Sequence, residues 1–169
     1  SISVYFLLAL RLSKEALPKY IIFTMASALS FLVAILILYS AKQSFSYDDA
    51  RASYLSLTSI ESFFFVSLML FGIFVKLGVI GFHYWLVDSY EESHDIFTAY
   101  FSAIVSKMGI YALIILLVHV VHPPYILALM GVLTSILATF KAIQEDSIKR
   151  LLAYSSIAQV GYIVTVLDV

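Results

Sequence analysis

The chain has 169 residues, of which 62% are hydrophobic and only 12% are charged, and its formal net charge is −1. Because soluble domains contain about 25% charged residues, this composition predicts a membrane protein, and the balanced charge argues against a nucleic-acid-binding surface. The sequence has no cysteine, which excludes disulfides, thiolate-bound iron–sulfur clusters and zinc sites built on cysteine.

The apolar stretches predict an all-α, polytopic bundle of transmembrane helices that forms one membrane domain over residues 1–169. A transmembrane helix needs about 20 apolar residues. Ser1–Leu10 is shorter, and we expect it to be the exit end of a helix whose beginning is absent from the sequence. Five full spans follow in chain order: Tyr20–Tyr39, Phe63–Trp85, Phe97–Val121, Tyr125–Ile143 and Leu151–Leu167.

The loop charges orient these spans. One side of the membrane receives six basic residues: Arg11, Lys14, Lys19, Lys141, Lys149 and Arg150. The other side receives only Lys42 and Arg51. The positive-inside rule therefore places the first side in the cytoplasm or the matrix. The loop after the second span is acidic, and it forms either an entrance that gathers cations or an ordinary solvated surface. Its acidic residues are Asp88, Glu91, Glu92 and Asp95.

Lys141 lies near the end of the fourth predicted span and can snorkel to the surface. Two other basic residues, Lys76 and Lys107, lie well inside predicted spans, with no acidic residue nearby in the same span. A lysine at the bilayer centre costs about 2.5–3.5 kcal/mol on insertion scales, and such residues commonly mark an ion or proton path through a bundle. Both lysines are therefore predicted to be proton-relay sites. For Lys107 the alternative is a structural lysine that donates to a carbonyl of a neighbouring helix.

The span around Lys76 contains Gly72, Gly78 and Gly81. Glycine costs about 1 kcal/mol in a helix relative to alanine, so this concentration predicts close packing or a break near Gly78–Gly81. A broken helix is tolerated in a membrane where it lines a cavity or meets protein. His83, seven residues after Lys76, is either a proton relay to the water phase or an interfacial histidine beside an aromatic pair.

Hydroxyl groups flank Lys107 and could pass a proton to its amine. Tyr111 lies four residues after it on the same helical face, and Ser102 and Ser106 lie nearby. Lys149, in the short connection before the last span, either points back into the bundle as a further relay or anchors that connection.

Four stretches carry a family resemblance. Lys76–Leu86, KLGVIGFHYWL, resembles the K-x-x-x-x-P-F-H-x-W-x-P-D signature of the antiporter-like subunits of respiratory complex I. Asp146–Tyr162, DSIKRLLAYSSIAQVGY, resembles the D-I-K-R-L-L-A-Y-S-S-I-x-x-x-G-Y signature of the same family. Tyr100–Leu113 resembles the family's lysine-bearing helix. Ser13–Leu29 resembles the E-A-x-x-K-Y-F connection of NADH dehydrogenase subunit 2, which favours that branch of the family.

The resemblance implies a role for each of three residues. Lys76 matches the family's central lysine, which pairs with a glutamate on a neighbouring helix. Lys107 matches the next lysine along the hydrophilic axis, which passes protons between half-channels, and His83 matches the histidine of the broken-helix region. The resemblance also implies that NADH, FMN, iron–sulfur clusters and ubiquinone are bound by other subunits. We therefore predict no cofactor or metal site in this chain.

The chain departs from the family pattern at several positions. Gly81 and Val87 replace two prolines, and Ser93–Phe97 replaces the A-P-T/P segment of the loop. A glycine can still break a helix, so the broken architecture is expected to survive. The family's glutamate would lie just before Ser1. We therefore expect a split or partial form, in which a second chain supplies the missing helices and the partner glutamate.

These features predict a proton-translocating membrane-arm subunit of NADH:ubiquinone oxidoreductase, assembled with other membrane-arm subunits in the mitochondrial inner membrane. A bacterial or archaeal plasma membrane is the alternative location. Two other functions stay open. One is a subunit of a multisubunit cation/proton antiporter or a membrane-bound hydrogenase. The other is a structural fragment of the membrane arm with no proton path of its own.

Overall fold

The computed structural model describes residues 16–43, 46–100, 102–103, 106–121 and 125–167. Every regular element in these ranges is helical, which confirms the predicted all-α fold. The helices are α2 (Ala16–Lys42), α3 (Tyr47–Ser56), α4 (Ser59–Leu77), α5 (Tyr84–Glu92), α6 (Asp95–Tyr100), α7 (Ser106–His119), α8 (Ile126–Gln144) and α9 (Ile148–Val166). The predicted half-span Ser1–Leu10 lies outside the described residues.

Three helices in the described ranges are long and apolar enough to cross a membrane, namely Ala16–Ala41, Ser59–Leu77 and Ile126–Gln144. They correspond to the first predicted span, the first part of the second, and the fourth. The fifth predicted span corresponds to α9, a helix of 19 residues. Large apolar side chains stay exposed along these helices. Among them are Met25, Leu29, Leu32, Leu129, Leu133 and Phe140. A face of this kind suits contact with lipid or with other helices.

The described residues of the predicted span Phe97–Val121 are not all α-helical. The short helix α6 covers Asp95–Tyr100, Ser102 and Ala103 are π-helical, and α7 covers Ser106–His119. Hydropathy cannot reveal such a turn, because the residues on both sides of it are equally apolar. π turns occur mostly as single insertions within helices and often lie at functional sites.

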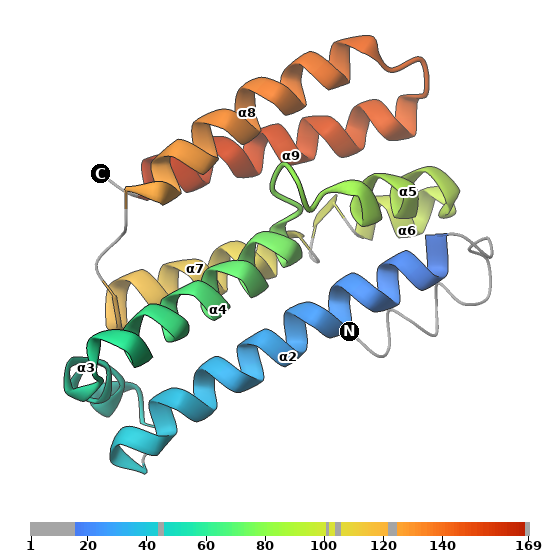
Figure 1. Ribbon diagram of the computed structural model, residues 1–169. Coiled ribbons are helices and arrows are strands. Elements are labelled where there is room, and N and C mark those ends of the chain that lie inside the picture. The colour runs from blue at the N-terminus through green and yellow to red at the C-terminus, as the bar shows by residue number, and fades with distance from the viewer. Residues whose placement is uncertain (1–15, 44–45, 101, 104–105, 122–124, 168–169) are drawn as a thin grey trace.

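Helices far apart in the sequence pack side by side (Figure 1). α4 lies between α2 and α7, and α8 and α9 form a hairpin. The short helix α5 packs against both α2 and α9, which places it between the two parts of the bundle. An apolar cluster around Trp85, with Tyr20 of α2 and Tyr154 and Ile157 of α9, fills this junction.

The α8–α9 hairpin is held by an unusually close approach of two backbones. A Cβ atom added to Gly161 would lie 2.6 Å from the Ser135 nitrogen, and one added to Gly131 would lie 2.6 Å from the Thr165 nitrogen. Small residues let membrane helices pack this closely. The hairpin is therefore a tightly packed unit beside the break in the second predicted span.

Candidate functional site

The second predicted span is broken after Leu77, as the glycines predicted. Gly78 adopts a left-handed conformation, with φ 68° and ψ 36°. Its N–H donates to the Val75 carbonyl at 3.3 Å, and the N–H of Val79 donates to the Phe74 carbonyl at 3.1 Å, so the last turn of α4 is capped. Gly81 also has a positive φ, 99°, and the chain resumes as α5 at Tyr84.

Trp85, in the first turn of α5, reaches back across the break. Its indole N–H donates to the Val75 carbonyl at 3.0 Å, one residue before Lys76. The side chain is fully buried, and its ring meets Tyr20 of α2 edge-on with centroids 5.7 Å apart. The two halves of the broken helix are therefore joined by a buried hydrogen bond as well as by packing.

Lys76 is half-buried in the last turn of α4. Within the described residues its amine has no hydrogen bond or ion pair, so the partner carboxylate that the family resemblance predicts is not found there. The C-terminal end of a helix carries partial negative charge from its carbonyls, and this favours a cation in the last turn.

His83 is buried in the connection between the two halves of the helix. Its Nδ1 accepts the Gly81 N–H at 3.3 Å, and its ring stacks on Tyr84 with centroids 4.3 Å apart. The ring lines a cavity of about 430 Å³ whose charged lining residues are Asp88, Lys141, Glu145 and Arg150. The helical spacing that would have aligned His83 with Lys76 does not apply, because the helix is interrupted between them.

Lys107 is the second residue of α7, and the π-helical residues Ser102 and Ala103 precede it in the chain. Its ammonium donates to the main-chain carbonyl of Ser102, and the Ser102 hydroxyl lies 3.0 Å from the Ser156 hydroxyl of α9. The carbonyl belongs to Ser102, five residues earlier in the same predicted span, and not to a neighbouring helix as the structural alternative had it. The side chain of Ser106 lies outside the described part of the structure.

The helices that carry the two lysines pack closely against each other. A Cβ atom added to Gly109, two residues after Lys107, would lie 2.8 Å from Leu77 Cδ2, and Leu77 directly follows Lys76. Gly109 thus permits a close approach of α7 to the end of α4. The sequence signalled neither this contact nor the π turn.

Lys149 both anchors its connection and faces the bundle. Its ammonium donates to the Ser93 carbonyl at 2.7 Å and lies 3.0 Å from Asp95. This pairing holds the pKa of the Asp95 carboxyl below its ordinary value, because the lysine's hydrogen bond and positive charge both favour the ionised form. Lys149 and Lys107 line the same cavity of about 690 Å³, together with Asp95 and Thr98.

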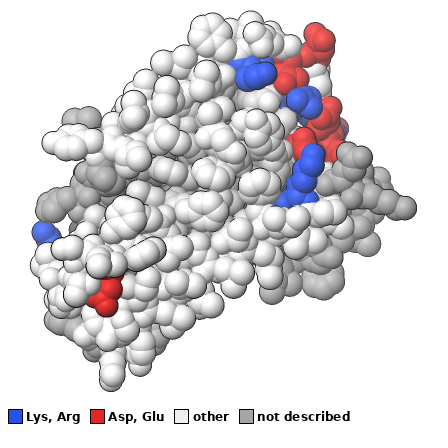
Figure 2. Space-filling view, viewed as in Figure 1, with Lys and Arg blue, Asp and Glu red and all other residues white. Residues whose placement is uncertain are grey.

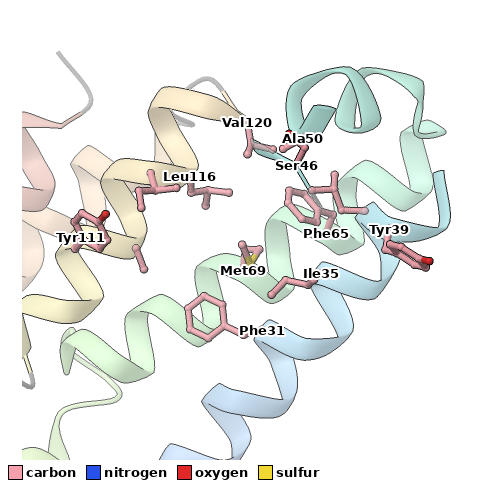
Figure 3. Close-up of a pocket in the computed structure, with 13 residues that line it drawn as sticks. Phe31, Ile35, Tyr39, Ser46, Ala50, Phe65, Met69, Tyr111, Leu116 and Val120 are labelled. Carbon is pink, nitrogen blue, oxygen red and sulfur yellow. The ribbon is translucent and has the colours of Figure 1, made fainter. Parts of the chain in front are cut away.

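Tyr111, the predicted hydroxyl neighbour of Lys107, faces a different space (Figure 3). It is 68% exposed and lines an apolar cavity of about 460 Å³. Side chains of α2, α3, α4 and α7 form the walls of this cavity, among them Phe31, Phe65 and Leu116. The structure therefore brings Lys107 and Lys149 to one cavity and does not bring Tyr111 to it.

Charged side chains gather at one end of the molecule, around α5 and the α8–α9 turn (Figure 2). Arg150 bonds Glu91 of α5 at 2.9 Å and Glu145 at 2.8 Å. Lys19 of α2 bonds Asp88 at 2.6 Å. Part of the acidic loop is therefore engaged in ion pairs, and sequence reasoning had not identified Arg150 as its partner. Four of the six basic residues predicted to share one membrane side lie here, namely Lys19, Lys141, Lys149 and Arg150, whereas Arg11 and Lys14 lie outside the described residues.

The whole chain, residues 1–169, matches the family described as NADH:quinone oxidoreductase/Mrp antiporter, TM. It is 30% identical over 161 residues to NADH-quinone oxidoreductase subunit N of Mycobacterium tuberculosis, covering 91% of this chain and 30% of the relative. It is 33% identical over 157 residues to NAD(P)H-quinone oxidoreductase subunit 2 of Synechococcus sp., covering 89% of this chain and 30% of the relative. The chain thus spans about 30% of the length of these relatives.

The fold resembles a subunit in the structure of the Mrp complex from a Dietzia species. The TM-score is 0.81 at 21% sequence identity, and the match covers 90% of this chain and 29% of that chain. At this identity the likeness concerns the arrangement of the helices.

Proposed function

Because the chain belongs to the NADH:quinone oxidoreductase/Mrp antiporter family of transmembrane proteins, we propose that it is a proton-translocating membrane-arm subunit of NADH:ubiquinone oxidoreductase. The observation that carries the proposal is the cavity of about 690 Å³ that Lys107 shares with Lys149 and Asp95. This cavity connects an intramembrane lysine with the charged end of the molecule, which the positive-inside rule assigns to the cytoplasm or matrix.

In the proposed path a proton enters at the charged end and passes along the cavity to Lys107. Thr98 and Ser102 line the route and offer hydroxyls that exchange protons. Lys107 would pass the proton towards Lys76, whose helix contacts α7 through Leu77 and Gly109. His83 offers a second connection, from the break to the charged residues of its own cavity.

A carboxylate outside the described residues would set the affinity of Lys76 for its proton. A nearby negative charge favours the ammonium form, and desolvation disfavours it. Movement or neutralisation of that carboxylate would release the proton. The free energy for this change would come from quinone chemistry in other subunits, since we propose no redox cofactor in this chain.

The test is proton translocation by the assembled complex that contains this chain. We expect Lys107→Ala and Lys76→Ala each to reduce the protons moved per NADH oxidised. Arg51→Ala is the matched control, because Arg51 is an exposed cation on α3, away from both cavities. Normal translocation in an assembled complex that carries either lysine variant would refute the proposal.

The fold likeness to an Mrp complex favours a second candidate, a subunit of a multisubunit cation/proton antiporter. The same lysine geometry would serve that function. The two candidates differ in their partners: quinone-reductase subunits would co-purify with the chain in the first case and antiporter subunits in the second.

A purely structural role draws support from the bond between Lys107 and the Ser102 carbonyl, which satisfies that lysine within the chain. Lys76 has no such bond among the described residues, so a structural role does not account for it. The relatives named above are bacterial. We accordingly propose a multi-pass protein of a bacterial plasma membrane or of the mitochondrial inner membrane.

A further inference from the structure

The break between α4 and α5 requires partners for several backbone groups at membrane depth. In an unbroken helix each N–H donates to the carbonyl four residues earlier, and in a lipid environment an unpaired group is costly. Five successive N–H groups, from Gly78 to Phe82, all have partners here. Gly78 and Val79 donate to the last turn of α4, Gly81 donates to His83, and Phe82 donates to the Val79 carbonyl at 2.8 Å.

The remaining N–H of the five, that of Ile80, has a partner from another part of the bundle. It donates to the Thr134 hydroxyl of α8 at 3.4 Å. In a continuous helix this same N–H would donate to the main-chain carbonyl of Lys76, four residues earlier. Within the described residues no donor reaches that carbonyl. The Ile80 N–H thus donates to Thr134 instead of to the main-chain carbonyl of Lys76.

Thr134 differs from the other threonines of the long helices. The hydroxyls of Thr24, Thr139 and Thr165 each donate to the carbonyl four residues earlier, at 2.6, 2.7 and 2.9 Å. Such back-bonding is the usual way for a threonine to satisfy its hydroxyl inside a helix. The fully buried Thr134 hydroxyl makes no bond of this kind within the described residues and instead accepts from the break.

We propose that Thr134 is a positioning residue of the Lys76 site. By accepting the Ile80 N–H it holds the break open and keeps the main-chain carbonyl of Lys76 clear of a backbone donor. That carbonyl, in the last turn of α4, then keeps its lone pairs available to a water molecule or another proton carrier at the break. The proposal deepens the proposed function and rests on it for the role of Lys76. It also makes the α8–α9 hairpin part of the lysine site.

The test compares Thr134→Val, which keeps the side-chain shape and removes the oxygen, with Thr134→Ser, which keeps the oxygen. Thr139→Val is the matched control on the same helix, because Thr139 is exposed and bonds only its own helix. Amide hydrogen exchange is measured over residues 78–83 in the assembled complex. Loss of one net hydrogen bond predicts exchange at Ile80 about two- to tenfold faster in Thr134→Val. Thr134→Ser and Thr139→Val should match the parent protein.

The second readout is the pH profile of proton translocation, which we expect to shift in Thr134→Val and to return in Thr134→Ser. Unchanged exchange in Thr134→Val, equal acceleration in Thr139→Val, or an unmoved pH profile would each overturn the proposal. The exchange measurement does not depend on translocation. If Lys76→Ala left translocation intact, the proposed function would fail, whereas the Thr134–Ile80 bond would still be judged by exchange alone.

Discussion

The indole N–H of Trp85 and the main-chain carbonyl of Val75 are 3.0 Å apart, on opposite sides of a break in the backbone. Val75 immediately precedes Lys76, so this bond fixes the turn of helix that presents the lysine. The carbonyl also accepts the N–H of Gly78. Both of its lone pairs are therefore used, one by the cap of α4 and one by α5.

Replacing Trp85 with phenylalanine should loosen the junction between α4 and α5. A smaller aromatic ring would remain, and the Val75 carbonyl would keep the Gly78 N–H but lose its second donor, a net hydrogen bond worth about 0.5–1.5 kcal/mol. We expect a lower thermal midpoint of the complex and weaker proton translocation at normal assembly. Tyr125→Phe serves as the control, because Tyr125 is 92% exposed. An equal loss of stability in both variants would show that the indole bond has no special role.

The two positive-φ glycines of the break should respond differently to asparagine, which tolerates the left-handed region better than other residues do. A Cβ atom at Gly78 would lie 2.8 Å from Leu86 Cδ2, whereas one at Gly81 meets nothing within 4 Å. Both substitutions place a side chain at positive φ and should destabilise the complex, and Gly78→Asn should cost more because its Cβ also meets Leu86. Thermal unfolding of the two variants checks this order, and a greater loss from Gly81→Asn would contradict it.

The Asp95–Lys149 pair should respond to pH in a defined direction. The folded-state pKa of Asp95 is lowered from its ordinary 3.8, so the pair contributes stability above that value and loses it as pH falls through the lowered pKa. Lys149→Met should raise the pKa of Asp95 back towards 3.8. Isotope-edited infrared titration of the aspartate carboxylates can follow this change. Lys141→Met is the control, and an Asp95 titration that does not move with Lys149 would exclude the pairing.

The helical architecture and the break could be predicted from the sequence because both depend on local composition. Long apolar runs require helices in a membrane, and the glycines near Lys76 marked the place where one helix stops. The π turn at Ser102 could not be predicted in this way. A π-helical residue is still helical, so hydropathy does not distinguish it from the α-helical residues of the same span.

The two lysines could be identified from the sequence because a charged residue inside an apolar span is costly. The residues that surround them in the folded structure could not be predicted. Thr134 is 54 residues from Ile80 in the sequence, and nothing in its local pattern separates it from Thr139, five residues later. The predicted pairing of Lys107 with Tyr111 relied on helical spacing alone. Spacing gives the direction of a side chain along its own helix, whereas the cavity that it faces depends on how distant helices pack.

The ion pairs of α5 have a mechanical consequence. Lys19 of α2 holds Asp88, and Arg150 of α9 holds Glu91 one helical turn further along. These two ion pairs link α5 to α2 and to α9. A movement of the α8–α9 turn relative to α2 would therefore tilt or rotate α5. Because Trp85 bonds the same helix α5 to the turn that bears Lys76, a displacement of the charged surface would be transmitted to that turn.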